Sequence, residues 1–265
     1  MQLAHILTLL ILPLLGCFFA IHYELSYFTN VVLIYILPGL YLTCVNTNRR
    51  HALQRLVFAL LVPFAFAFVV DYIGTVSSLW TVPHTFLPWR VYAVIPLEDF
   101  VWMIGGVYTI MTCYEFFAGK TPGKLNTRKL TYFSAIAAFG LAIFFALSAT
   151  HPELFVWHNR FAYLILGLTF AGIPTIILMA RFWRAYVKVY YVIAYFLFLT
   201  VTLEYTETVL GQWLFNGNYA LRPLAFAGSP GIPYEELFFV GIVEVLIAVG
   251  FYTFFTSQRE VVGSK

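Results

Sequence analysis

Long apolar runs dominate the chain and decide the environment in which it can fold. Eight mostly apolar stretches of about 20 residues follow one another: 3–21, 26–45, 53–76, 96–118, 130–150, 160–180, 186–211 and 233–256. A helix of about 20 residues crosses the hydrocarbon core of a bilayer and satisfies its own backbone hydrogen bonds there. The sequence therefore predicts an all-α polytopic membrane protein with about eight transmembrane helices.

Composition excludes the main soluble classes. Apolar residues make up 62% of the chain and charged residues 10%, against about 45–50% and about 25% in soluble domains. The net charge of +3 leaves no basic face for nucleic acid, so we expect no nucleic-acid partner. No glycine-rich nucleotide loop and no His/Cys cluster with metal-ligand spacing is present, so we expect neither cofactor nor metal.

The basic residues divide unequally between the two sides that eight spans define. One side carries three: Arg90, Arg160 and Arg222. The other carries twelve: Arg49, Arg50, Arg55, Lys120, Lys124, Arg128, Lys129, Arg181, Arg184, Lys188, Arg259 and Lys265. Because basic loops stay in the cytoplasm, the pattern predicts a multi-pass protein with cytoplasmic termini.

The chain repeats itself. Three motifs recur in the same order. His22-x-Glu24-Leu25 recurs as His151-x-Glu153-Leu154 (151 − 22 = 129), and Asp71-Tyr72-x-x-Thr75-x-x-x-x-Trp80 recurs as Glu204-Tyr205-x-x-Thr208-x-x-x-x-Trp213 (204 − 71 = 133). Pro96-Leu97-Glu98-Asp99-Phe100 recurs as Pro233-Tyr234-Glu235-Glu236-Leu237 (233 − 96 = 137). Each copy holds four predicted helices, so both copies have the same orientation in the membrane. We predict two parallel four-helix repeats, 1–119 and 129–265, joined by a cytoplasmic linker, 120–128, around a pseudo-two-fold axis.

Seven of the twelve acids gather at one predicted depth, near the side opposite the basic loops. An ionisable group in a membrane helix is costly and usually faces the protein interior. A carboxyl group that stays neutral there can donate a proton. The candidate catalytic residues are therefore Asp71, Glu98, Asp99, Glu204, Glu207, Glu235 and Glu236.

Two further acids differ from this set. Glu244 lies in the middle of the last helix and has no acidic counterpart, because 244 − 137 gives Val107. It is a candidate for an asymmetric site residue. Glu115 lies near the basic end of the fourth helix, where we expect it to pair with lysines.

Aromatic residues form 20% of the chain and accompany the acids. Ring faces attract cations, most strongly where water is excluded. Aromatic walls beside neutral acids would suit protonation of an alkene and guidance of the resulting carbocation. The candidate substrate-binding residues are Tyr72, Trp80, Phe100, Trp102, Tyr205, Trp213, Phe238 and Phe239.

The paired segments Pro96-Leu97-Glu98-Asp99-Phe100-Val101-Trp102 and Pro233-Tyr234-Glu235-Glu236-Leu237-Phe238-Phe239 resemble the small integral-membrane lycopene cyclases. In that family two homologous units act together, and this chain resembles the fused form. The first copy departs from the pattern at Asp99 and Trp102. The resemblance implies acid-initiated, non-redox cyclisation of linear lycopene at the bilayer, with other carotenoid-pathway enzymes as further partners.

Other functions stay open at this point. A carotenoid or isoprenoid hydratase would use the same acids but admit water to the cation. A small-solute transporter would also use intramembrane acids, although its path must open to both sides. A structural or lipid-binding membrane protein would not depend on the paired glutamates.

Overall fold

The computed structural model describes residues 2–45, 51–119, 123–216, 219–221 and 223–256. Within these residues, eight helical segments succeed one another along the chain. They are α1 (Gln2–Tyr23), α2 (Tyr27–Asn30) continued by η1 (Val31–Ile36) and α3 (Leu37–Val45), α4 (Ala52–Val76), α5 (Leu97–Ala118), α6 (Thr127–Thr150), α7 (Ala162–Gly167) continued by η4 (Leu168–Gly172) and α8 (Ile173–Phe182), α9 (Val189–Val209), and α10 (Tyr234–Phe238) continued by η6 (Phe239–Val243) and α11 (Glu244–Phe255).

The segments confirm an all-α, multi-pass membrane protein with the predicted boundaries correct to a few residues. Seven are long and apolar enough to cross a membrane as they stand, and α4 qualifies as two pieces bent by 42°. The bend follows Pro63, which lies inside α4. Proline removes a helix hydrogen bond and clashes with the preceding turn, so it kinks a helix that lipid still holds together.

Three of the helices contain a π-helical stretch, which the sequence analysis did not predict. These are η1, η4 and η6, in the second, sixth and eighth segments. A π-stretch widens a helix by one residue and re-aims the side chains around it, often at functional sites. Two of them, η4 and η6, pack against each other, and both border the site described below.

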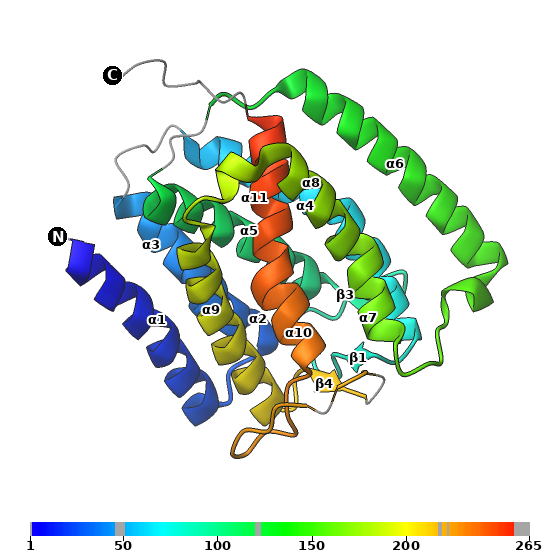
Figure 1. Cartoon of the computed structure of the whole chain (residues 1–265). Helices are drawn as coiled ribbons and strands as arrows, with labels where there is room; N and C mark the ends of the chain where they lie inside the picture. The colour runs from blue at the N-terminus through cyan, green and yellow to red at the C-terminus, as the bar shows by residue number, and fades with distance from the viewer. Residues whose placement is uncertain (1, 46–50, 120–122, 217–218, 222, 257–265) are drawn as a thin grey trace.

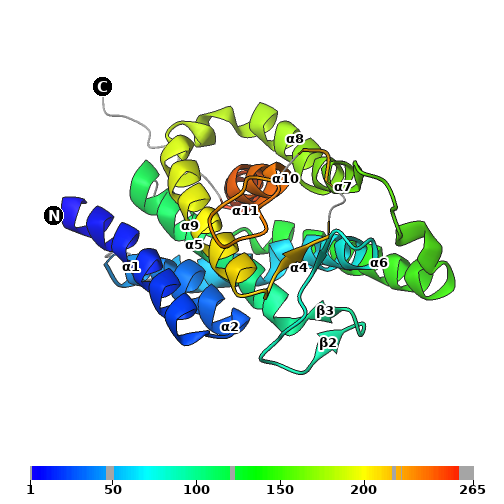
Figure 2. The same ribbon diagram turned by 90° about the horizontal axis from the view of Figure 1, so that it is seen from below.

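The helices form a bundle with an inner and an outer set (Figures 1 and 2). Of the membrane-spanning windows, that of α5 is 67% buried, whereas that of α6 is only 11% buried. The outer helices α1 and α6 lie at opposite edges of the bundle (Figure 1). Helix α1 packs on α9, and α6 packs on α4. Each outer helix therefore contacts an inner helix that is distant in sequence.

Two short antiparallel ladders lie in the loops after α4 and α9. Strand β1 (Trp80–Thr81) pairs with β4 (Leu214–Phe215), and β2 (Arg90–Val91) pairs with β3 (Ile95–Pro96). The first ladder joins loops from the two halves of the sequence. Its position brings Trp80 and Trp213 together beneath the loops.

A buried ion pair joins three helices in the basic half of the bundle. Arg55 Nη1 of α4 lies 2.5 Å from Glu115 Oε2 of α5, and the Tyr252 hydroxyl of α11 donates to Glu115 Oε1 at 2.7 Å. The Arg55 guanidinium also lies over the Tyr108 ring. Glu115 therefore pairs with an arginine from another helix, and the expectation of nearby lysines was wrong.

Several predictions from charge and duplication stay predictions. Residues 120–122 of the predicted linker lie outside the described residues, as do Arg49, Arg50, Lys120, Arg222, Arg259 and Lys265. The cytoplasmic placement of the termini and the limits of the two repeats thus rest on the sequence.

Replacing Arg55 with leucine should destabilise the protein by about 3–5 kcal/mol, because Glu115 would be left buried without a compensating charge. The double variant Arg55→Leu with Glu115→Leu should recover much of that loss. Thermal unfolding of the purified variants in one detergent measures both effects. Equal stability of the single variant and the parent would contradict a structural role for the pair.

Candidate functional site

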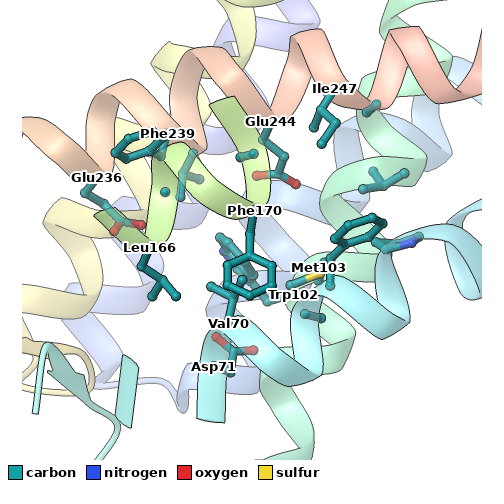
Figure 3. Close-up of a pocket in the computed structure, with 18 of the residues that line it drawn as sticks. Val70, Asp71, Trp102, Met103, Leu166, Phe170, Glu236, Phe239, Glu244 and Ile247 are labelled. Carbon is teal, nitrogen blue, oxygen red and sulfur yellow. The ribbon is translucent and has the colours of Figure 1, made fainter. Parts of the chain in front are cut away.

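An apolar cavity of about 170 Å³ lies between α4, α5, the α7–η4 helix and the α10–η6–α11 helix. Three carboxyl side chains line it: Asp71, Glu236 and Glu244. Most of the remaining wall is aliphatic or aromatic, and Figure 3 shows Phe170 projecting between the acids. The cavity therefore combines an apolar lining with a few convergent polar groups, which is typical of small-molecule sites.

The three acids reach the cavity from two helices. Glu236 stands in the first turn of α10, and Glu244 stands eight residues later (244 − 236), at the start of α11. Eight residues correspond to about 12 Å along a helix, so the two acids mark different depths. Asp71 comes from α4 and projects into the same space from the opposite wall (Figure 3).

None of these three carboxyl groups forms a salt bridge among the residues that the structure describes, where the pairs found are Arg55–Glu115 and His151–Glu153. The Tyr163 hydroxyl of α7 donates a hydrogen bond to Glu236 Oε2. One oxygen each of Asp71 and Glu244 is buried without a hydrogen-bond partner. Such carboxyl groups can exchange a proton with a molecule in the cavity.

Three tryptophans close one end of the cavity. The Trp80 and Trp213 rings stack with centroids 6.2 Å apart and an interplanar angle of 21°, and Trp102 lies 6.4 Å from Trp213. Trp80 can lie flat against α4 because residue 74 is glycine. A Cβ atom there would come within 2.1 Å of the indole.

A second group of buried acids, Asp99, Glu204 and Glu207, lies close to the first, because Asp71 interacts electrostatically with Asp99 as well as with Glu236. Glu207 interacts electrostatically with Glu204 and with Asp99. Tyr27 lies beside Asp99, and its ring centroid is 6.0 Å from that of Trp213. The first group has a similar tyrosine, Tyr163, whose ring centroid lies 5.3 Å from that of Trp80. Tyr163 donates a hydrogen bond to Glu236, whereas the Tyr27 hydroxyl has no hydrogen-bond partner among the described residues.

The side chain of Tyr35 lies near acids of both groups, since it interacts electrostatically with Glu244, Glu204 and Glu236. A Cβ on Gly106 would lie 3.4 Å from both the Tyr35 ring and Glu244 Oε1. The Tyr35 ring centroid lies 6.1 Å from that of Trp102 and 5.1 Å from that of Phe196. Its hydroxyl hydrogen-bonds Thr200 Oγ1 at 2.8 Å. The offsets of the sequence repeat give each neighbour an equivalent residue in the other half. Trp102 corresponds to Phe239 (239 − 102 = 137), Phe196 to Pro63 (196 − 63 = 133) and Thr200 to Ala67 (200 − 67 = 133). All three equivalents line the open cavity.

Two of the predicted acids hold loops instead of facing the cavity. Glu98 Oε1 accepts a hydrogen bond from the Leu87 amide at 2.7 Å. Glu235 Oε1 accepts from the amides of Ala220 at 2.5 Å and Leu221 at 3.2 Å. Each carboxyl group thus accepts hydrogen bonds from the loop that precedes its own helix. The loop residues Leu87 and Ala220 are 133 residues apart (220 − 87), the same spacing as Asp71 and Glu204.

The predicted aromatic residues divide in the same way. Four of the eight candidates line the cavity: Trp80, Trp102, Trp213 and Phe239. The other four do not. Phe100 packs on Phe64 and Phe68, and Tyr72 packs on Tyr92, Phe144 and Phe155. The Tyr205 hydroxyl donates to the Ala227 carbonyl, and Phe238 is 46% exposed on the outside of the bundle.

Sequence reasoning missed the two tyrosines beside the acids. Tyr27 and Tyr163 stand 136 residues apart (163 − 27), as do Pro38 and Pro174 (174 − 38). Aligning the second and sixth helices on these prolines would have paired the tyrosines. The motifs that revealed the repeat lie outside this stretch, so the tyrosines carried no signal of their own.

Comparison with protein-family models, with curated proteins and with solved structures gives no match. Among the described residues, no group of three or more His, Cys, Asp or Glu side chains has an arrangement that could hold a metal ion.

Glu235→Ala should loosen the loop before α10, because the amides of Ala220 and Leu221 would lose their acceptor at a cost of about 1–3 kcal/mol. Glu235→Gln keeps an acceptor oxygen and serves as the control. Hydrogen exchange of these two amides in detergent should speed up in the alanine variant alone. Unchanged exchange in Glu235→Ala would mean that the carboxyl group does not hold the loop.

Proposed function

We propose that this protein is a carotenoid end-group cyclase that converts linear lycopene into a cyclic carotene without net redox change. The observation that carries the proposal is the apolar cavity, which is lined by aromatic rings and by three carboxyl groups that form no salt bridge among the described residues, the buried Asp71 and Glu236 and the half-buried Glu244. Acid-initiated cyclisation of an alkene needs a proton donor, a proton acceptor and a surface that tolerates a carbocation without supplying water.

The proposed reaction balances with one proton gained and one lost. Glu236, in its neutral form, protonates the terminal double bond of the linear end. The resulting tertiary cation is attacked by the next double bond, which forms the ring C–C bond. A carboxylate across the cavity, for which Asp71 is the candidate, removes a ring proton and sets the new double bond. Tyr163 holds the Glu236 carboxyl group in place through its hydrogen bond.

The rings around the cavity have a matching role. Trp80, Trp102 and Phe239 present aromatic surface to the space where the cation would form. Ring faces stabilise a cation by up to about 2 kcal/mol when they are desolvated. They also leave little room for water, whose addition would give the alcohol that a hydratase makes.

A pseudo-two-fold relation between the halves, which the proposal includes, is supported by contacts across the middle of the bundle. In the β1–β4 ladder Thr81 pairs with Leu214, and these residues are 133 apart (214 − 81). A pair of equivalent residues in an antiparallel ladder lies on a two-fold axis. The stacked Trp80 and Trp213, also 133 apart (213 − 80), meet beside the same point.

We further propose that one of the two acid groups is the working site. Asp71 and Glu236 line the cavity, whereas Asp99 and Glu204 do not, and Tyr35 lies near Glu204. Ala171 stands at the position equivalent to Tyr35 (171 − 35 = 136) and lines the open cavity. A small residue in one half and a tyrosine in the other would thus decide which acids meet the substrate.

Glu236→Gln and Asp71→Asn should each lower cyclisation by about a hundredfold or more, because each removes a group that transfers a proton. Glu98→Gln is the matched control, since that acid holds a loop and its amide oxygen can still accept. Pigments extracted from a lycopene-accumulating bacterium expressing each variant give the measurement, normalised to the amount of folded protein.

The parent protein separates the rival functions in the same assay. Growth in heavy water should place one deuterium in each new ring through the protonation step. A hydroxylated linear pigment would instead identify a hydratase. Abundant folded protein with neither product would overturn the proposal.

Tyr35→Ala should open a second cavity beside Glu204 and raise the number of bound linear carotenoid molecules per chain from one to two. Tyr35→Phe keeps the ring and loses only the hydroxyl, so its stoichiometry should stay at one. Titration of the detergent-purified Glu236→Gln background, which cannot turn the substrate over, gives the count. A stoichiometry of one in Tyr35→Ala would show that the ring does not close the second site.

A further inference from the structure

A second apolar space lies beside the cavity, between α4, α6, η4 and the segment around η3 (Pro152–Phe155). This groove has a volume of about 530 Å³. Its lining is almost wholly aliphatic and aromatic and includes no acid or base. Phe66 and Phe170 line both the groove and the cavity, so the two spaces border each other at these side chains.

The groove exists because α6 stands away from the helix that follows it. Among the described residues, α6 packs closely on α4 and on α11 but not on α7, η4 or α8. The other outer helix, α1, packs tightly on η1, where a Cβ on Gly16 would come within 3.2 Å of Ile34. Figures 1 and 2 show α6 at the edge of the bundle. A Cβ added to Gly140, which faces the groove from α6, would meet nothing within 4 Å.

The sizes of the two spaces bear on what the groove holds. Pockets that enclose a drug-sized ligand measure about 300–1,000 Å³. The cavity, at about 170 Å³, encloses only an end group, so the rest of a long ligand must leave it. The cavity borders the groove at Phe66 and Phe170, and Figure 3 shows Phe170 directed toward the acids from its helix.

We propose that the groove between α4 and α6 binds the linear apolar tail of the substrate while its end group lies among the acids. Phe66 and Phe170 form the passage between the two. The inference rests on the proposed function and adds a binding site to it. The groove carries no acid or base, so it holds and orients the tail and takes no part in proton transfer. A lipid acyl chain is the alternative occupant.

The test fills the groove without touching the acids. Gly140→Phe projects a ring into the open space, and Ala137→Leu adds a smaller side chain to the same wall, should the first variant fold poorly. Ala138→Phe is the matched control, because residue 138 is exposed on α6 and does not line the groove. Each purified variant is assayed with full-length lycopene and with a short acyclic isoprenoid that has the same end group and no tail.

Filling the groove should lower the ratio of kcat/KM for lycopene to kcat/KM for the short substrate by about tenfold to a hundredfold, since a misplaced tail misplaces the reacting end. Ala138→Phe should keep the parental ratio. A parental ratio in both groove variants would assign the groove to lipid and overturn the inference alone. Failure of the parent protein to cyclise either substrate would overturn the proposed function, and the tail-binding role with it.

Discussion

Carboxyl groups buried in lipid-embedded helices are the constraint around which this bundle is built. Each is expensive in a bilayer unless it is paired, hydrogen-bonded or placed where a ligand meets it. The protein uses all three solutions. Arg55 pairs with Glu115 in the basic half, loop amides receive Glu98 and Glu235, and Asp71, Glu236 and Glu244 face a cavity.

Adjacent acids in one motif have different surroundings because of helix geometry. Successive residues of an α-helix point about 100° apart. Glu235 therefore faces the preceding loop while Glu236 faces the cavity, although both stand in the first turn of α10. Glu98 and Asp99 divide in the same manner at the start of α5, where Glu98 receives a loop amide and Asp99 lies beside Tyr27. The paired-acid motif thus combines a structural residue and a site residue in each copy.

Under the proposed duplication, the two halves would differ around the cavity. Tyr35 stands where the other half has Ala171, which lines the cavity, and α6 borders a groove whereas α1 packs tightly on η1. Glu244 adds an acid where the other half has Val107. All three differences lie on the side of the cavity, which agrees with the proposal of a single working site.

The sequence by itself determined the membrane class, the number of helical segments and the seven candidate acids. The length of each apolar run can be read directly from the chain. A charged residue inside such a run stands out because it is costly in lipid. Only the tertiary structure decided four other features. It paired Glu115 with Arg55, placed Tyr163 on Glu236, introduced the π-helical stretches, and directed each acid to the cavity or to a loop. These depend on which helix faces which and on rotations of about 100° per residue. The position of Tyr35 is the clearest case. Its place in an apolar run reads as ordinary packing, and only the tertiary structure shows that its ring lies against Trp102 and Phe196 and its hydroxyl against Thr200.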